Sequence, residues 1–192
     1  MKSDLVILDR DGVINYDSDD YIKSVAEWSP IPGSLEAIAR LSRADFRIVV
    51  ATNQSGIARG LYNLTTLNQI HQKMTAALRD HGGQIEAIFF CPHGPDDGCD
   101  CRKPRPGLLH QISERLNVPL ADVPVVGDSL SDLQCASRVG ARPVLVRTGK
   151  GVTTESLLAD EESDSALENT LVFNDLAGFT EALLQGDLDA IG

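Results

Sequence analysis

The chain has 192 residues, and its 17 Lys and Arg against 28 Asp and Glu give a formal net charge of −11 at neutral pH. A composition that is 42% hydrophobic and 23% charged is that of a globular protein and excludes a chain that is disordered over most of its length. The acidic charge argues against a protein that coats nucleic acid or an anionic membrane, because both surfaces require clustered Lys and Arg.

The length and the cysteines set the expected organisation. One domain over residues 1–192 is expected at this length. Apolar runs such as 5–8 and 48–51 are far shorter than the roughly 20 residues that cross a bilayer, and no signal-peptide core follows Lys2. Three of the four cysteines lie within residues 91–101, which fits thiols in a reducing compartment better than two disulfides. We therefore expect a cytoplasmic monomer with no nucleic-acid or membrane partner.

Short apolar runs alternate with segments of helical period along the chain. The runs are continuous rather than alternating, which is typical of parallel strands buried on both faces. This pattern predicts an α/β fold with a doubly wound, Rossmann-like parallel sheet. The acidic, Ser-rich segment 159–169 is predicted to be an exposed loop. Strands are predicted at 5–8, 48–51, 87–90, 124–126, 143–146 and 172–173, and helices at 34–44, 66–79, 109–116, 132–139 and 176–184.

Polar side chains follow several of these strands at the point where each strand ends. Asp9 and Asp11 follow the first strand, Thr52 the second and Asp128 the fourth. In a parallel sheet these positions meet at one edge, where ligands bind. Taken singly, an Asp after a strand is more often a helix cap or a turn residue. Three carboxylates gathered at one edge would repel one another unless a cation joined them, and oxygen ligands of this kind suit Mg²⁺.

The pattern of D-x-D-G, a strand-terminal Thr, a later Lys and G-D-x-x-x-D resembles the four motifs of the haloacid dehalogenase family of phosphatases, over about residues 5–150. The resemblance implies that Asp9 attacks the phosphoryl group and forms an aspartyl-phosphate. It implies that Asp11 first protonates the leaving oxygen and then deprotonates the attacking water.

The same resemblance implies the supporting groups. Thr52 and Lys103 would stabilise the phosphoryl oxygens, and Mg²⁺ would be held by the Asp9 carboxylate, the Asp11 carbonyl and Asp128. Asp132 is either a carboxylate in the first turn of a helix or a support for the metal site, and the sequence leaves both open.

A second group of residues has the spacing of metal ligands: Cys91 and His93, then Cys99 and Cys101. Three thiolates and one imidazole complete a tetrahedral Zn²⁺ site without an open position, so the zinc would be structural. The polar segment 94–98 cannot be held by core packing, and a metal would order it. The alternative is a set of buried thiols beside a turn histidine.

Residues 12–51 and 53–101 are too short to hold a cap domain that closes over the substrate. Part of that closing role would fall to the loop with the proposed zinc ligands, residues 91–101, and to residues 15–28. The segments LDRDGVIN, ATNQSGIARG and CPHGPDDGCDCRKPRPG resemble the capless, histidinol-phosphatase-like branch of the family. Within it, they are similar to enzymes that remove the 7-phosphate of a heptose 1,7-bisphosphate for lipopolysaccharide synthesis. Histidinol phosphate or another small phosphomonoester is the alternative substrate. A non-catalytic, zinc-stabilised binding protein is the alternative of a different class.

The resemblance also implies contacts with a small phosphorylated sugar. Ser129 stands where some members carry a Lys that recognises the substrate, so another cation must hold the distant phosphate of a bisphosphate. The substrate-contact candidates are Asp17, Tyr21, Asn53, Gln54, Ser55 and Arg102, and the cation candidates are Arg102, Arg105, Arg59, Arg147 and Lys150.

Four residues stand outside these groups. Cys135 is predicted to be a buried core thiol. His71, His81 and His110 are predicted at surface or satisfied structural positions.

Overall fold

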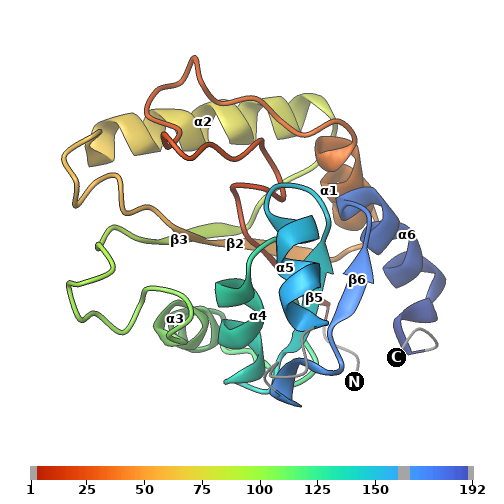
Figure 1. Cartoon of the computed structure of the whole chain (residues 1–192). Coiled ribbons are helices and arrows are strands. Elements are labelled where there is room, and N and C mark those ends of the chain that lie inside the picture. The colour runs from red at the N-terminus through yellow and green to blue at the C-terminus, as the bar shows by residue number, and fades with distance from the viewer. Residues whose placement is uncertain (1–3, 160–164, 190–192) are drawn as a thin grey trace.

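Six parallel strands form the sheet at the centre of the fold, in the order β3-β2-β1-β4-β5-β6 (Figure 1). The computed structural model describes residues 4–159 and 165–189. The chain runs outward from β1 to one edge of the sheet and then returns to the other side of β1 with β4. The strands are β1 (Leu5–Leu8), β2 (Arg47–Asn53), β3 (Ala87–Cys91), β4 (Pro124–Gly127), β5 (Arg142–Val146) and β6 (Leu171–Phe173).

Helices cover both faces of this sheet (Figure 1). Successive residues of β1 divide between two cores, because the side chains of a strand alternate between its faces. Val6 and Leu8 pack with α1, α2 and α6, whereas Leu5 and Ile7 pack with α3 and α4. The predicted doubly wound α/β fold is confirmed. The helices are α1 (Ser34–Arg43), α2 (Leu64–Asp80), α3 (Gly107–Leu116), α4 (Leu130–Ser137), α5 (Gly151–Leu158) and α6 (Leu176–Gln185).

The connections at the carboxyl ends of the strands hold no cap domain. Residues 9–33, all of them described, contain neither a helix nor a strand, and α2 is the only such element between β2 and β3. Within the described part of the chain, no helix is both long and apolar enough to cross a membrane. In the absence of a cap, loops border the carboxyl edge of β1, β2 and β4, including residues 17–22 and 102–103.

The segment between β1 and α1 is fastened to α2. Trp28 is 1% exposed, and the Lys73 ammonium lies 5.5 Å from the centroid of its ring. The same ammonium donates hydrogen bonds to the carbonyl oxygens of Val25, at 2.8 Å, and Trp28, at 2.7 Å. One side chain of α2 therefore holds this segment along the rim of the carboxyl edge.

Two parts of the chain differ from the sequence-based expectation. Helix α5 occupies a stretch for which no element was predicted. In the segment predicted to be a loop, Ser165–Leu167 form a short 3-10 helix whose Leu167 is buried, while residues 160–164 lie outside the described residues. A second 3-10 helix, Asp187–Asp189, follows α6.

Candidate active site

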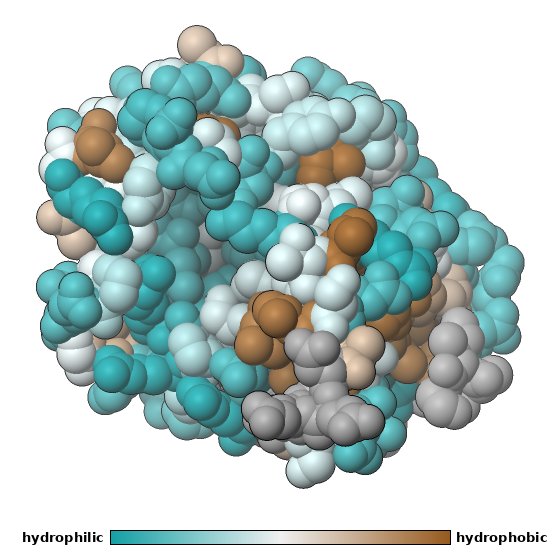
Figure 2. Space-filling model, viewed as in Figure 1, coloured by the Kyte–Doolittle hydropathy of each residue, from teal (hydrophilic) through white to brown (hydrophobic). Residues whose placement is uncertain are grey.

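A cleft of about 260 Å³ lies at the carboxyl ends of β1, β2 and β4. Its polar lining agrees with the hollowed, hydrophilic area left of centre in Figure 2. The chain reverses its direction across the sheet between β1 and β4, which is where open α/β sheets bind ligands. The cleft brings together every catalytic and substrate-contact residue predicted from the sequence: Asp9, Asp11, Asp17, Tyr21, Thr52, Asn53, Gln54, Ser55, Arg102, Lys103 and Asp128.

Three carboxylates meet on the floor of the cleft. Asp9, Asp128 and Asp132 each offer one oxygen, and these oxygens lie within 4.8 Å of one another. Burial raises the pKa of Asp9 to about 7, although Lys103 opposes the shift. Burial, together with the charges of Asp132 and Asp9, raises the pKa of Asp128 to about 8. The fold thus keeps negative charges together at a free-energy cost that a divalent cation would relieve, and the donor set fits Mg²⁺.

Lys103 is buried among these carboxylates. Its ammonium lies 3.0 Å from Asp9 Oδ1 and 2.5 Å from Asp132 Oδ1, and it donates to the carbonyl oxygen of Ala51 at 2.8 Å. Burial opposes its charge, but Asp132 and Asp9 outweigh this effect and raise the pKa of Lys103 above its usual value. The buried lysine is therefore a fixed positive charge beside Asp9.

Asp132 takes part in two interactions of the site. It forms a capping box with Ser129 at the start of α4, where its Oδ2 accepts from the Ser129 hydroxyl at 2.6 Å. Its other oxygen pairs with Lys103. The first alternative left open by the sequence, a carboxylate in the first turn of a helix, is thus confirmed. The same carboxylate also orients Lys103, and its support of a metal site stays a prediction.

Two glycines enclose the Asp128 side chain. Gly12 and Gly149 have φ values of 80° and 58°, in the left-handed region that favours glycine. A Cβ atom at either position would collide with the Asp128 carboxylate. On its other side, Asp128 Oδ2 accepts a hydrogen bond from the backbone N–H of Lys150 at 2.8 Å. Backbone on both sides therefore fixes this carboxylate.

Asp11 points to a different set of partners. Arg10 donates to both of its oxygens, from Nη2 at 2.8 and 2.9 Å and from Nε at 3.1 Å. Asn15 and Gln54 each donate to it at 2.9 Å. Burial favours the protonated form, but Arg10 and these hydrogen bonds hold the pKa of Asp11 below its usual value. Asp11 is therefore a carboxylate held in one orientation.

The predicted substrate contacts Asn53 and Gln54, at the end of β2 and just after it, form hydrogen bonds with other protein groups. The Gln54 amide donates to Thr52 Oγ1 at 2.9 Å and accepts from the Tyr62 hydroxyl at 2.6 Å. Since Thr52 Oγ1 accepts there, its hydroxyl proton is directed to another acceptor. Asn53 exchanges two hydrogen bonds with the backbone of Lys103, both at 3.1 Å. In this structure Gln54 and Asn53 thus act as supports for Asp11 and Lys103.

Sequence reasoning missed the roles of Arg10 and His71. Arg10 is 1% exposed, and its Nη1 lies 3.3 Å from His71 Nε2. The signal for His71 was its position in α2, four residues after buried Leu67 and three before buried Met74, which places it on the apolar face. His71 is buried with a partner, so the prediction of a satisfied structural position is confirmed for it.

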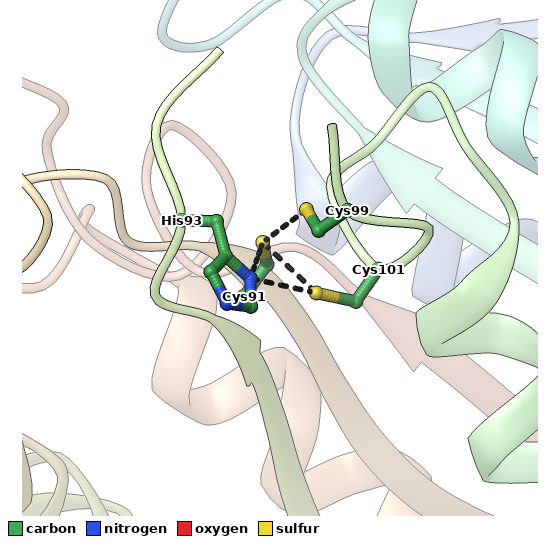
Figure 3. A group of neighbouring side chains, drawn as sticks. All are labelled: Cys91, His93, Cys99 and Cys101. Atoms are coloured by element: carbon green, nitrogen blue, oxygen red, sulfur yellow. Dashed lines mark hydrogen bonds between the residues drawn. The ribbon is translucent and has the colours of Figure 1, made fainter. Parts of the chain in front are cut away.

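The cysteine and histidine cluster assembles as predicted (Figure 3). His93 Nδ1 lies 3.2 Å from Cys101 Sγ and 3.6 Å from Cys91 Sγ. Cys91 Sγ lies 3.7 Å from Cys99 Sγ and 3.2 Å from Cys101 Sγ. Burial, together with the neighbouring Cys101 thiol, raises the pKa of Cys91 to about 12, which is unfavourable for a bare thiolate. Four converging soft donors of this kind fit a tetrahedral metal ion.

The cations suggested for a distant phosphate fall into two groups. Arg102 and Lys150 line the cleft. The Lys150 ammonium lies 3.2 Å from Asp17 Oδ2 and 3.6 Å from Asp19 Oδ1 at its rim. The others do not line the cleft themselves: Arg59 lies over the ring of Tyr21, which does line it, Arg105 is held by the carbonyl oxygen of Cys99, and Arg147 by Glu155.

The predictions for Cys135, His81 and His110 are confirmed. Cys135 is 0% exposed, as predicted for a core thiol. His110 is exposed on α3, and His81 is exposed at the end of α2, 3.4 Å from Glu36. All four cysteines are free thiols.

A capless parallel sheet with Asp9, Lys103 and Asp128 around one cleft defines a hydrolase of the haloacid dehalogenase class. Two family models match the chain: polynucleotide kinase 3 phosphatase over residues 5–135 and HAD-hydrolase-like over residues 100–179. The chain belongs to the family of D-glycero-beta-D-manno-heptose-1,7-bisphosphate 7-phosphatases, as similarity along nearly its whole length shows.

Three relatives illustrate that similarity. The chain is 55% identical over 185 residues to the member from Pseudomonas aeruginosa, covering 96% of this chain and 100% of the relative. It is 37% identical over 187 residues to the member from Escherichia coli, covering 93% and 92%. A crystal structure of D,D-heptose 1,7-bisphosphate phosphatase from Bordetella bronchiseptica, complexed with magnesium and phosphate, is 56% identical, covers 95% of this chain and 98% of that chain, and superposes with a TM-score of 0.89.

Proposed function

We propose that this chain hydrolyses the 7-phosphate of D-glycero-beta-D-manno-heptose 1,7-bisphosphate and leaves the sugar 1-phosphate. The observation that carries the proposal is the ion pair between Asp9 and the buried Lys103, 3.0 Å apart, on the floor of a cleft that also holds Thr52 and Asp128. The substrate is the one named for the relatives. Such a product would serve the synthesis of ADP-heptose for the lipopolysaccharide core.

In the first step an Asp9 carboxylate oxygen forms a bond to phosphorus while the bond to the sugar oxygen breaks. The Lys103 charge and the Thr52 hydroxyl stabilise the phosphoryl oxygens as their charge shifts. Asp11 gives a proton to the leaving oxygen, since the negative phosphate beside it raises the pKa of Asp11 and favours its protonated form.

In the second step water hydrolyses the aspartyl-phosphate. Asp11, now a carboxylate, takes a proton from the water while its oxygen attacks phosphorus, and the bond to Asp9 breaks. The hydrogen bonds from Arg10, Asn15 and Gln54 stabilise Asp11 in the charged form that this step requires. Inorganic phosphate leaves, and Asp9 is restored.

Asp9, Asp128 and the Asp11 backbone carbonyl would hold Mg²⁺. When bound, this ion supplies positive charge between the nucleophile and the phosphate. The gathered carboxylates of Asp9 and Asp128 support this assignment, as does the relative crystallised with magnesium and phosphate. Cys91, His93, Cys99 and Cys101 would hold a structural Zn²⁺.

For the distant phosphate of the sugar we propose Arg102 and Lys150, since both line the cleft and neither is fully buried. Asp17, Tyr21 and Ser55 also line the cleft and are proposed as sugar contacts. We also propose a single domain over residues 1–192, a monomeric state and a cytoplasmic location. One sheet formed by both halves of the chain supports the single domain, and the free thiols support the location.

The test is phosphate release with Mg²⁺ from the beta and alpha anomers of the heptose bisphosphate and from histidinol phosphate. We expect the highest kcat/KM for the beta anomer, with the 1-phosphate as the product by phosphorus NMR. Asp9→Asn should fold and release no phosphate. A preference for histidinol phosphate would reject the substrate and leave the chemistry, whereas full activity of Asp9→Asn would reject the chemistry.

A further inference from the structure

Arg10, which stands between Asp9 and Asp11 in the sequence, carries a buried positive charge. Its side chain is 1% exposed, so its charge must be satisfied by protein groups. Two of its three nitrogens donate to the two oxygens of Asp11, at 2.8 to 3.1 Å. This two-point contact fixes both the position and the plane of the carboxylate, which a single hydrogen bond cannot do.

The third nitrogen of Arg10 leads to α2. Nη1 lies 3.3 Å from Nε2 of His71, which is 8% exposed. A guanidinium group only donates, so Nε2 must be the acceptor and the imidazole must be neutral with its proton on Nδ1. Burial, together with the charge of Arg10, lowers the pKa of His71 to about 4, in agreement with a neutral ring. The ring also packs edge to face on Phe90, with centroids 6.3 Å apart.

Helix α2 therefore reaches the acid/base residue through a line of contacts. His71 orients Arg10, and Arg10 orients Asp11. We propose that Arg10 and His71 are positioning residues for the water step, holding the Asp11 carboxylate where it removes a proton from the water that hydrolyses the aspartyl-phosphate. The inference rests on the covalent route of the proposed function.

The two steps of the reaction should respond differently when this line of contacts is broken. In the water step the oxygen of water bonds to phosphorus, the bond from phosphorus to Asp9 breaks, and a proton passes from water to Asp11. That step needs the base whatever the substrate. The first step needs little help from Asp11 when the leaving group is already a stable anion, as with 4-nitrophenyl phosphate.

The test compares His71→Leu, which cannot accept a hydrogen bond, with His71→Gln, whose amide oxygen can. His110→Leu, at an exposed position of α3, is the matched control. With 4-nitrophenyl phosphate and Mg²⁺ we expect His71→Leu to lower kcat and KM together by about tenfold, a fraction of the usual contribution of a general base, and to leave kcat/KM nearly unchanged. His71→Gln should recover most of the loss, and His110→Leu should match the wild type.

A direct readout accompanies the kinetics. Acid-quenched His71→Leu should carry more phosphoryl-Asp9 than the wild type by mass spectrometry with 4-nitrophenyl phosphate as the substrate, because formation of the intermediate continues while its hydrolysis slows. The wild type should form the intermediate with the heptose bisphosphate as well. Arg10→Lys, which keeps the charge but cannot contact both oxygens in the same way, should give the same pattern if His71→Leu fails to fold.

Two results would overturn the inference. One is an equal fall of kcat and kcat/KM without extra phosphoenzyme, which is the behaviour of a purely structural residue. The other is an unchanged kcat in both His71→Leu and Arg10→Lys. A wild-type protein that forms no phosphoenzyme with either ester would instead reject the covalent route itself, and so separates a failure of the proposed function from a failure of this inference.

Discussion

The charged residues of the cleft fall into two groups according to their burial. Buried ones are paired with other protein groups, whereas exposed ones can bind a ligand. Lys103 and Arg10 are 4% and 1% exposed, and their charges are taken up by Asp9, Asp11 and Asp132. Removing one partner of such a buried pair typically destabilises a protein by about 3–5 kcal/mol, because the other charge is left unpaired. Lys150, whose side chain is 58% exposed, can instead exchange its contacts with Asp17 for a phosphate at little cost.

Arg102→Ala tests whether a cleft cation that is not fully buried binds the distant phosphate. We expect the substitution to raise KM for the heptose bisphosphate by about tenfold or more, since a charge-assisted contact to phosphate is worth roughly 1.5–3 kcal/mol. It should raise KM for a heptose 7-phosphate much less. Arg115→Ala, at an exposed position of α3, is the control. Equal effects on both substrates would show that Arg102 does not contact the second phosphate.

At the scale of elements, the loop after β3 connects the cysteine and histidine cluster to Lys103. Cys101 is followed directly by Arg102 and Lys103, and Arg102 Nη1 lies 3.4 Å from the carbonyl oxygen of His93. The backbone N–H of Gly107, at the start of α3, donates to the Asp100 carbonyl at 2.9 Å. The cluster therefore fixes the segment that delivers Lys103 to the cleft.

Cys99→Ser should reduce the bound zinc from about one ion per chain to well below one, since one of four ligands is lost. We expect a lower Tm and a lower kcat/KM, because Arg102 and Lys103 lose their anchor. Metal analysis and thermal unfolding would measure both. Cys135→Ser, outside the cluster, should keep its zinc. Protein purified without chelator that contains no zinc would refute the assignment.

The elements also show which parts of the fold the sequence predicts. The strands were predictable because buried parallel strands are continuously apolar, as in β1. Helix α5 was missed because Gly151 and its β-branched neighbours have low helix propensity. Tertiary contacts hold it instead, including the hydrogen bond from the Thr154 hydroxyl to the Asp128 carbonyl at 2.8 Å. Helix α4 begins two residues earlier than predicted, at Leu130, because the capping box of Ser129 and Asp132 was overlooked.

Those residues of the candidate site that belong to short sequence motifs were predictable. Recognisable sequence patterns mark four of its residues. Asp9, Asp11 and Thr52 lie at the ends of strands, Lys103 follows the cysteine and histidine segment 91–101, and the cleft brings them together. The contact of Arg10 with His71 joins residues 61 positions apart, and no local pattern specifies such a pair.

For the whole molecule, the order of the strands decides where negative charge collects. Because β1 and β4 are neighbours in the sheet, Asp9 and Asp128 leave adjacent strand ends and point into one cleft. Asp132 from α4 joins them, so three carboxylates gather on the floor of the cleft. The stability of the fold should consequently depend on the cation that joins them.

Adding Mg²⁺ to desalted protein should raise Tm by roughly 5–10 °C at a concentration a hundredfold above its Kd, since binding to the native state alone adds about 2.7 kcal/mol. Asp128→Asn should abolish most of this shift. It should also raise the Tm of the protein without Mg²⁺, because the free-energy cost of burying an ionisable carboxyl beside Asp132 and Asp9 is removed. NaCl at equal ionic strength is the control, and chelators are avoided because they would also strip zinc. The same shift in Asp128→Asn as in the wild type would refute the carboxylate site.

Lys73 makes the segment before α1 a fixed rim. Because one ammonium holds the carbonyl oxygens of both Val25 and Trp28, this rim is in place before any ligand arrives. Binding then carries no free-energy cost for ordering a loop, so more of the affinity of each contact is retained. A preformed rim of this kind favours a ligand that fits the cleft as it stands over one that must first displace residues 25–28 from α2.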